Sequence, residues 1–231
     1  YKTCHAGKWH LSDNPLEYGF DGNIGGGHNG HPKSYYPPYK NVHIQGDQDD
    51  YLTDLIMEKT LEYVDTVSSP FFLYYAPYAV HTPIHPVERF LEKYNQKPGS
   101  NGQNNAKYAT MVENLERNIG LLLTKMRNKG IYDNTLIIFT SDNGGLYGIT
   151  EQRPLRAGKG SYYEGGIREP FFFVLKDRIS ENSKSNIPIT NLDIFPTILH
   201  YAGINDSQLQ LDGNNLSSVL EGKTDKLDRP L

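Results

Sequence analysis

Helical periodicity marks two long segments of the chain, and proline marks the start of a shorter helix between them. Apolar side chains recur about every 3.6 residues over 51–67, which predicts an amphipathic helix that begins after two acidic residues. The same period over residues 106–129 lines one face and reaches Gly130, which predicts a long helix terminated by glycine. Residues 87–91 follow a proline and are expected to begin a short helix.

Three apolar runs are too short and too continuous to be amphipathic helices. Residues 71–76, 136–139 and 170–175 consist almost entirely of apolar and aromatic side chains, as is typical of buried strands in parallel sheets. Another helix is expected to open at residues 190–196. Strands that alternate with helices in this way predict an α/β fold, with a doubly wound, mostly parallel sheet covered by helices on both faces.

Two long stretches show neither kind of periodicity. Residues 19–41 and 144–166 are rich in glycine and polar residues, so both are predicted to be irregular loops. Loops of this length inside compact domains are usually functional. No repeat or linker is evident. Residues 1–204 are predicted to form one domain, and residues 205–231 a surface segment that follows it.

Composition narrows the class of partner. The 231 residues, 37% of them hydrophobic, are enough to bury a core. A net charge of −4 argues against a nucleic-acid partner, so an anionic substrate must be held by local cations. The chain has no run of about 18 apolar residues that could span a membrane. The single cysteine, Cys4, allows no internal disulfide and is expected to be an ordinary buried side chain. The sequence indicates no particular oligomeric state.

Residues with candidate chemistry stand beside the predicted strands. Asp142 and Asn143 directly follow the 136–139 run, where open parallel sheets bind ligands, and their oxygen atoms suit Ca²⁺ or Mg²⁺. Taken alone, an Asp-Asn-Gly triplet is more often a simple turn. Lys8 and His10 would face the same side of an extended segment and could donate to one oxyanion, although a solvated surface pair has the same sequence.

Two further candidates lie in loops. His81 follows the 71–76 run, and its imidazole is a candidate general acid because it can donate a proton near neutral pH. A histidine that only packs the loop is an equally good interpretation. Lys159 stands between glycines that would let the backbone approach an anion closely, but a flexible surface turn would look the same.

Taken together, these segments resemble the sulfatase family of the alkaline phosphatase superfamily. Residues 1–11 are similar to the family's second signature, with Ser12 where glycine is usual. Residues 71–83 resemble the strand that delivers a substrate-contacting histidine, and residues 140–145 match the metal-binding motif. Residues 155–168 match the loop that carries the sulfate-binding lysine. The resemblance implies an alkaline-phosphatase-like fold and sulfuric ester hydrolysis.

The resemblance also implies roles for individual residues. Asp142 and Asn143 would form the later half of a Ca²⁺ or Mg²⁺ shell. The pair Lys8 and His10 would hold a formylglycine nucleophile and the sulfate. His81 and Lys159 would contact the sulfate and the bridging oxygen, with the histidine protonating the leaving alcohol.

The expected substrate is a sulfated carbohydrate, because residues 22–32 resemble a segment of bacterial sulfatases that act on sulfated polysaccharides. His28, His31, Arg156 and Tyr162 are candidate sugar contacts, and each is at least as well explained as a residue that packs its loop. The same resemblance leads us to expect a periplasmic, extracellular or cell-surface protein.

Two elements of the family pattern are not found in the sequence. These are the Cys/Ser-x-Pro-x-Arg motif on which formylglycine is made and an earlier Asp-Asp pair of metal ligands. The chain opens without methionine and stops where the family's smaller C-terminal subdomain would begin. We therefore expect the middle of a sulfatase, with formylglycine on an upstream Cys or Ser. These residues alone are expected to be inactive and, with a strand edge uncovered, to aggregate.

Two other interpretations remain open at the level of sequence. A phosphodiester or phosphonate hydrolase of the same superfamily would share the metal motif. A non-catalytic relative that binds sulfated glycans would keep Lys8, His10, His81 and Lys159 but would have lost the nucleophile. The reading frame upstream of Tyr1 distinguishes the three.

Overall fold

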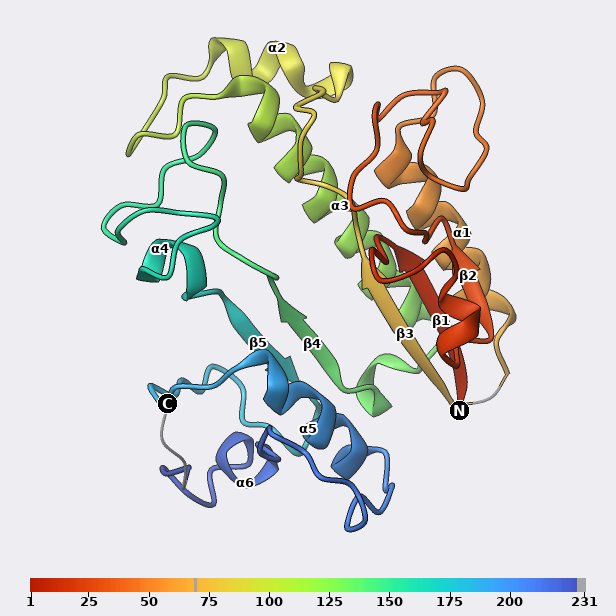
Figure 1. Ribbon diagram of the computed structural model, residues 1–231, viewed down its shortest axis with the longest axis vertical. Coiled ribbons are helices and arrows are strands. Elements are labelled where there is room, and N and C mark those ends of the chain that lie inside the picture. Colours follow the sequence, from red (N-terminus) through yellow and green to blue (C-terminus); the bar gives the residue numbers. More distant parts are fainter. Residues whose placement is uncertain (69, 228–231) are drawn as a thin grey trace. The chain divides into compact units, whose positions relative to one another are not determined.

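The computed structural model describes residues 1–68 and 70–227. The chain divides into two compact units (Figure 1). The first unit comprises Tyr1–Lys129 and Gly144–Ile167, and the second comprises Gly130–Asn143 and Arg168–Leu231. The end of the range predicted as a surface segment, residues 228–231, lies outside the described residues.

A parallel sheet of three strands forms the centre of the first unit (Figure 1). Strand β1, Lys2–Gly7, lies between β2, Gly22–Ile24, and β3, Phe71–Ala76. The strand predicted at residues 71–76 is confirmed. The other two strands escaped prediction, because β1 carries His5 within its buried stretch and β2 has only three residues.

Three helices of the first unit stand where the sequence predicted them. They are α1, Leu52–Thr66, α2, Glu88–Gln96, and α3, Ala106–Asn128. Helix α1 contacts β1 and β2 and packs against α3, which also contacts α2 (Figure 1). The core between sheet and helices is apolar and almost completely closed to solvent. Its fully buried members include Ala6, Tyr35, Leu52, Ile56 and Met111.

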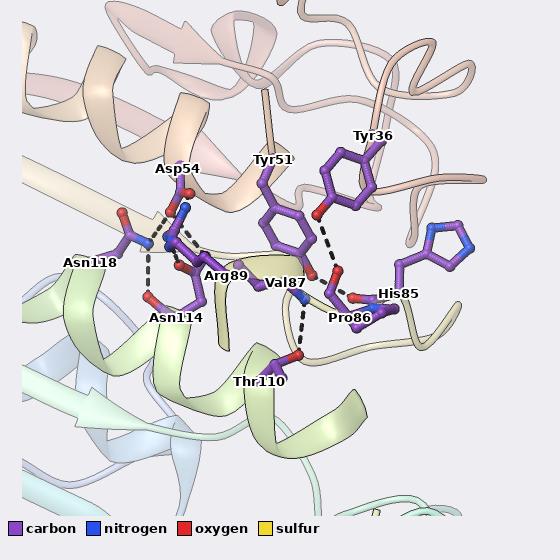
Figure 2. A network of polar contacts seen from close by, with 10 residues as sticks. All are labelled: Tyr36, Tyr51, Asp54, His85, Pro86, Val87, Arg89, Thr110, Asn114 and Asn118. Atoms are coloured by element: carbon purple, nitrogen blue, oxygen red, sulfur yellow. Dashed lines mark hydrogen bonds and ion pairs between the residues drawn. The ribbon is translucent and has the colours of Figure 1, made fainter. Parts of the chain in front are cut away.

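A buried polar network joins the three helices at one point (Figure 2). The Oδ1 atom of Asp54 on α1 accepts hydrogen bonds from Asn114 at 2.9 Å and Asn118 at 2.7 Å, both on α3. Arg89 of α2 donates to Asp54 Oδ2 at 2.9 Å and also to Asn114 Oδ1. Because every buried partner is hydrogen-bonded, the network avoids the cost of an unpaired buried group and fixes the register of the helices.

The second unit contains an antiparallel pair of strands and two short helices. Strand β4, Ile137–Thr140, pairs with β5, Phe171–Val174. The helices are α5, Ile194–Tyr201, and α6, Ser217–Leu220. The strands predicted from the apolar runs are thus confirmed. Their antiparallel pairing departs from a doubly wound arrangement, since the connection between them holds no long crossover helix.

Short elements mark the remaining turns. Helix α4, Glu164–Ile167, belongs to the first unit. Single 3₁₀ turns occur at Pro15–Tyr18, Tyr132–Asn134 and Asn191–Asp193, and the last of them leads directly into α5. A parallel sheet with flanking helices confirms the α/β class. Of the helices in the described part of the chain, none is both long and apolar enough to cross a bilayer.

Candidate functional site: a cluster of cationic side chains

The segment that carries Lys8 and His10 turns sharply as it leaves β1. Gly7 has a φ of 106°, and a Cβ atom there would lie 2.0 Å from the carbonyl oxygen of Ala76, so only glycine fits. The N–H of Lys8 donates to that same carbonyl at 2.6 Å. The extended conformation predicted for this segment is wrong, because β1 ends at Gly7 and His10 adopts a left-handed φ of 69°.

Contacts with the next loop hold His10 in place. Its N–H donates to the carbonyl of Gly27 at 2.9 Å. Its ring lies against Gly30, so closely that a side chain at that position would collide with it. His10 is therefore fixed beside the segment that carries His31, although its own side chain is largely exposed.

His81 lies in the loop that follows β3, and a buried tyrosine holds that loop. The hydroxyl of Tyr35 lies 2.7 Å from the carbonyl oxygen of Tyr78 and 3.0 Å from that of His81. The ring Nδ1 of His81 lies 3.0 Å from the carbonyl oxygen of Thr82. A carbonyl only accepts hydrogen bonds, so Nδ1 carries the proton of that bond and Nε2 is the nitrogen left for proton exchange.

The rest of this loop is tied to α3 and to the segment that leads into α1 (Figure 2). Two tyrosine hydroxyls donate to its backbone carbonyls, and a threonine of α3 accepts from its backbone N–H. Because three bonds restrain so short a segment, His81 enters the site from a rigid support. The pairs are Tyr51 with His85 at 3.0 Å, Tyr36 with Pro86 at 3.2 Å, and Thr110 with Val87 at 2.9 Å.

Lys159 lies in a loop that is held together by hydrogen bonds between backbone groups. Its N–H donates to the carbonyl of Gly145 at 3.0 Å, and the N–H of Gly165 donates to the carbonyl of Arg156 at 2.9 Å. The guanidinium of Arg156 lies 3.7 Å from the ring centroid of Tyr163, a cation–π contact. A cavity of about 430 Å³ opens here, lined by Tyr147 and residues 156–161.

Three side chains from separate segments lie close enough to His81 to affect its pKa, and together with it they form what we call the cationic cluster: Lys8, His31, His81 and Lys159. The His31 and His81 rings stack with centroids 5.5 Å apart. Burial lowers the pKa of His81, and the nearby Lys159, Lys8 and His31 lower it further, while the hydrogen bond to Thr82 acts in the opposite direction. Each added positive charge disfavours another in the same place, so the cluster suits an anion.

The predicted sugar contacts are distributed unevenly. His31 belongs to the cationic cluster, whereas His28 is exposed and makes no hydrogen bond within the described residues. Arg156 lines the cavity beside Lys159. Tyr162 is 95% exposed.

Asp142 and Asn143 lie in the second unit, just past the end of β4. The neighbouring Glu169 has a buried Oε1 atom without a hydrogen-bond partner in the described residues. Burial raises the pKa of Glu169, and the Asp142 carboxylate raises it further. Oxygen donors that repel one another in this way fit a hard divalent cation in chemistry.

The number of donors is too small for a complete metal site. Among residues 1–68 and 70–227, no group of three or more His, Cys, Asp or Glu side chains could hold a metal ion. Asp142 and Asn143 can therefore supply only part of a coordination shell, which for Ca²⁺ takes about six to eight oxygen ligands.

The sequence analysis did not identify two residues that support the site. Tyr35 is one of 17 tyrosines, and nothing in its loop marks it as the residue that holds the His81 backbone. His5 offers a weak signal, because a histidine stands between Cys4 and Ala6 in a stretch that is otherwise small and buried.

A protein-family model described as Sulfatase matches residues 1–204. The chain belongs to the sulfatase family. A sulfatase of Formosa agariphila is 35% identical over 194 residues, which cover 77% of this chain and 35% of that protein. The human N-acetylgalactosamine-6-sulfatase is 29% identical over 267 residues, covering all of this chain and 48% of the relative.

A solved structure extends the likeness to three dimensions. The crystal structure of Ps i-CgsB in complex with k-i-k-neocarrahexaose superposes with a TM-score of 0.79 and 34% identity, covering 95% of this chain and 55% of that one. The predicted family and its alkaline-phosphatase-like fold are confirmed. This sulfatase chain spans about a third to a half of the length of the curated relatives named above.

Proposed function

We propose that the protein to which these residues belong hydrolyses sulfate esters of a sulfated carbohydrate. The observation that carries this proposal is the cationic cluster, in which Lys8, His31 and Lys159 surround His81. A sulfate ester brings a negative charge that such a cluster would stabilise, and the charge that develops in the transition state would be held by the same donors.

Each member of the cluster has a chemical role in this proposal. Lys8 and Lys159 would bind the non-bridging sulfate oxygens through charge-assisted hydrogen bonds. His81 would give a proton from Nε2 to the departing alcohol oxygen, since the hydrogen bond to Thr82 already orients its ring. His10, held beside this group by Gly27 and Gly30, would contact the sulfate or the nucleophile.

The family chemistry also requires a formylglycine and a divalent cation, Ca²⁺ or Mg²⁺. Asp142 and Asn143 would hold the cation, with further ligands from outside the described residues. When bound, the two groups would supply a nucleophilic hydroxyl and a Lewis acid that neutralises sulfate oxygen charge. The formylglycine would arise on a Cys or Ser upstream of Tyr1.

The proposed substrate is a sulfated sugar chain rather than a small aryl sulfate. The support comes from relatives that are named for glycan sulfates or were solved with an oligosaccharide. Arg156 and Tyr162 stand on the loop of Lys159, and His28 and His31 on the loop beside His10, so both pairs could contact sugar units next to the ester. Aromatic faces and guanidinium groups are common contacts at the rims of such sites.

The same proposal places residues 1–204 in the central part of a catalytic domain, and residues 205–231 in a segment that leads toward a C-terminal subdomain. It also places the protein in the periplasm or outside the cell, where polymeric sulfated sugars are encountered. Residues 1–231 by themselves would not turn over substrate, because they lack the formylglycine motif.

The test begins with the complete reading frame that contains these residues. The complete protein, with Ca²⁺ present, would be assayed for sulfate release from a panel of sulfated glycans. A phosphodiester and a phosphonate ester of matched leaving group would be assayed in parallel. Sulfate release that falls strongly in Lys159→Ala supports the proposal. Faster turnover of the phosphorus esters would favour a phosphohydrolase, and glycan binding without turnover would favour a non-catalytic binder; both outcomes contradict it.

A further inference from the structure

His5 is a completely buried histidine that the proposed chemistry does not use. It stands on the central strand β1, where its register partners are Asn23 of β2 and Tyr74 of β3. The rings of Trp9, Phe20 and Tyr74 meet its ring edge to face, with centroids 5.2, 5.6 and 5.5 Å away. An apolar residue would fill such a place at lower cost, so the polar ring needs an explanation.

One nitrogen of this ring reaches the backbone of the cationic cluster. His5 Nε2 lies 3.0 Å from the carbonyl oxygen of Lys8. Because the carbonyl can only accept, Nε2 carries the hydrogen and donates it. Burial lowers the pKa of His5, which favours the neutral ring. In that neutral tautomer Nδ1 is unprotonated, and the side chain of Asn23 is the polar group beside it.

The backbone of Lys8 is thus held from two sides. Its N–H donates to Ala76 of β3 at 2.6 Å, and its carbonyl accepts from His5. The next residue, Trp9, rests on the His5 ring and donates from its indole nitrogen to Ser12 at 3.0 Å. The residue after that, His10, has the left-handed backbone, which is unfavourable for a residue other than glycine unless its surroundings support it.

The His5 ring is also closely packed on the side of Nδ1. A Cβ atom on Gly26 would lie 2.6 Å from His5 Nδ1 and 2.6 Å from Asn23 Oδ1. The loop after β2 therefore closes over the imidazole with no room for a side chain. The imidazole ring fills this space, and its far nitrogen reaches the Lys8 carbonyl.

We propose that His5 is a positioning residue, which fixes the turn of Lys8 and His10 through its Nε2–H bond to the Lys8 carbonyl and thereby sets the anion site. It does not touch the substrate. The inference rests on the proposed function, because it assumes that the cationic cluster binds the sulfate group.

Two amide variants separate the donor from the ring in the complete protein. In His5→Gln, the amide nitrogen can stand near the position of Nε2 and keep the bond to the Lys8 carbonyl. In His5→Asn, the shorter side chain places its amide near Nδ1 and cannot reach. Thr60→Val is the stability control, since Thr60 is fully buried and its hydroxyl donates to the Ile56 carbonyl at 2.7 Å within α1.

Three measurements are made on each variant: kcat and KM for sulfate release, the inhibition or binding constant of inorganic sulfate, and hydrogen exchange over residues 7–12. We expect His5→Asn to weaken inorganic sulfate binding and lower kcat/KM by about tenfold or more, with faster exchange in the turn. His5→Gln is expected to stay within about threefold of wild type in both. Melting temperatures show whether each variant is folded.

The outcomes are distinguishable from failure of the proposed function. Equal sulfate affinity in His5→Asn and His5→Gln, or a loss matched by Thr60→Val, overturns the positioning role. If the wild-type protein binds inorganic sulfate but releases none from esters, the proposed function fails, while the sulfate constants still decide the role of His5. If the wild type does not bind sulfate at all, both inferences fall.

Discussion

The two units hold their candidate functional side chains in different ways. In the first, the backbone beside Lys8 and His81 is fixed by Ala76 of β3 and by the buried hydroxyl of Tyr35. In the second, Asp142 is exposed and follows a strand of four residues. The first unit closes its own core, whereas the sheet of the second leaves apolar side chains in solvent. Phe139 is 43% exposed, Phe172 58% and Val174 41%.

This difference indicates which of the two sets of candidate residues is self-sufficient, the anion-binding set of the first unit or the cation-binding set of the second. An anion site built on a closed core and several backbone anchors keeps its geometry by local contacts. A cation site with two donors on the edge of an open apolar sheet needs ligands and packing from elsewhere. The comparison predicts that anion binding and cation binding will respond independently to mutation.

The largest effect is expected from substituting one residue of each set in the complete protein. Asp142→Ala should abolish cation-dependent turnover and weaken Ca²⁺ binding, while inorganic sulfate binding persists. Lys159→Ala should do the reverse, lowering kcat/KM by about 10²–10³-fold and weakening sulfate binding while Ca²⁺ still binds. Calorimetric titration with each ion, alongside turnover, measures both properties.

Asp133→Ala is the matched control in the second unit, because Asp133 forms an exposed ion pair with Lys176 at 2.5 Å. Exposed pairs of this kind contribute little, so turnover should be unchanged. Unchanged turnover in Asp142→Ala itself would remove that residue from the metal shell. If either variant loses both sulfate binding and Ca²⁺ binding, the two sets of residues do not act independently.

The next effect concerns the proton that His81 is proposed to donate. His81→Ala should lower the rate on sulfated sugars, whose alcohol leaving group needs protonation, by about 10²–10⁴-fold. Activated aryl sulfates need no such proton and should lose far less. Steady-state rates on a sulfated sugar and on an aryl sulfate measure the difference, and equal losses on both would argue against a general acid.

The pH dependence gives a second check on the same residue. Burial first, then Lys159, Lys8 and His31, lower the pKa of His81 from its ordinary value of 6.5 in the free protein. A general acid acts below its pKa, so kcat/KM should decline with rising pH from below that value. A bound sulfate ester adds negative charge and raises the pKa, so kcat should persist to higher pH. If kcat/KM and kcat decline over the same pH range, His81 is not the general acid.

Sequence patterns gave the helices and the apolar strands because these depend on local periodicity. The 3.6-residue repeat placed α1 and α3 within a residue or two of their ends. The central strand β1 could not be recognised in the same way, since a buried histidine interrupts its apolar pattern. Its burial depends on partners, Asn23 and Tyr74, that are distant in sequence.

The chemistry at the site was predicted by motif, but the supports of the site were not. The positions of Lys8, His81 and Lys159 followed from the family resemblance, and the structure brings them together. The conformation at His10 was predicted wrongly, because a left-handed residue there depends on tertiary contacts with Gly27 and Gly30. Such contacts leave no periodic trace in the sequence.

A smaller effect is expected from the hydroxyl that anchors the His81 loop. Tyr35→Phe removes the single buried hydroxyl donor that the carbonyls of Tyr78 and His81 share, and should lower the free energy of unfolding by about 1–3 kcal/mol. Tyr39→Phe is the matched control, since its hydroxyl donates to the Asp50 carbonyl at 2.9 Å, away from the cationic cluster. Both variants should be destabilised in denaturant unfolding, but only Tyr35→Phe should lose turnover. Equal turnover in the two would deny the hydroxyl any role in placing His81.

The smallest effect on stability should come from the exposed sheet of the second unit. Phe172 and Phe139 are register partners on one face, with ring centroids 5.9 Å apart. In residues 1–231 alone, Phe172→Thr should change the unfolding free energy by no more than about 0.5 kcal/mol, because the ring is largely in solvent. The same change should reduce self-association, since an uncovered apolar sheet is a docking surface for other copies.

Phe173→Thr is the control on the opposite face, where the ring is less exposed and stacks on Phe171 with centroids 5.4 Å apart. It should destabilise by more than Phe172→Thr and should not improve solubility. Sedimentation velocity over a range of concentrations, together with thermal unfolding, separates the two properties. If the unmodified residues 1–231 are monodisperse, or if Phe172→Thr destabilises them as strongly as Phe173→Thr, the face is already covered within the chain. In that case the second unit is as self-contained as the first.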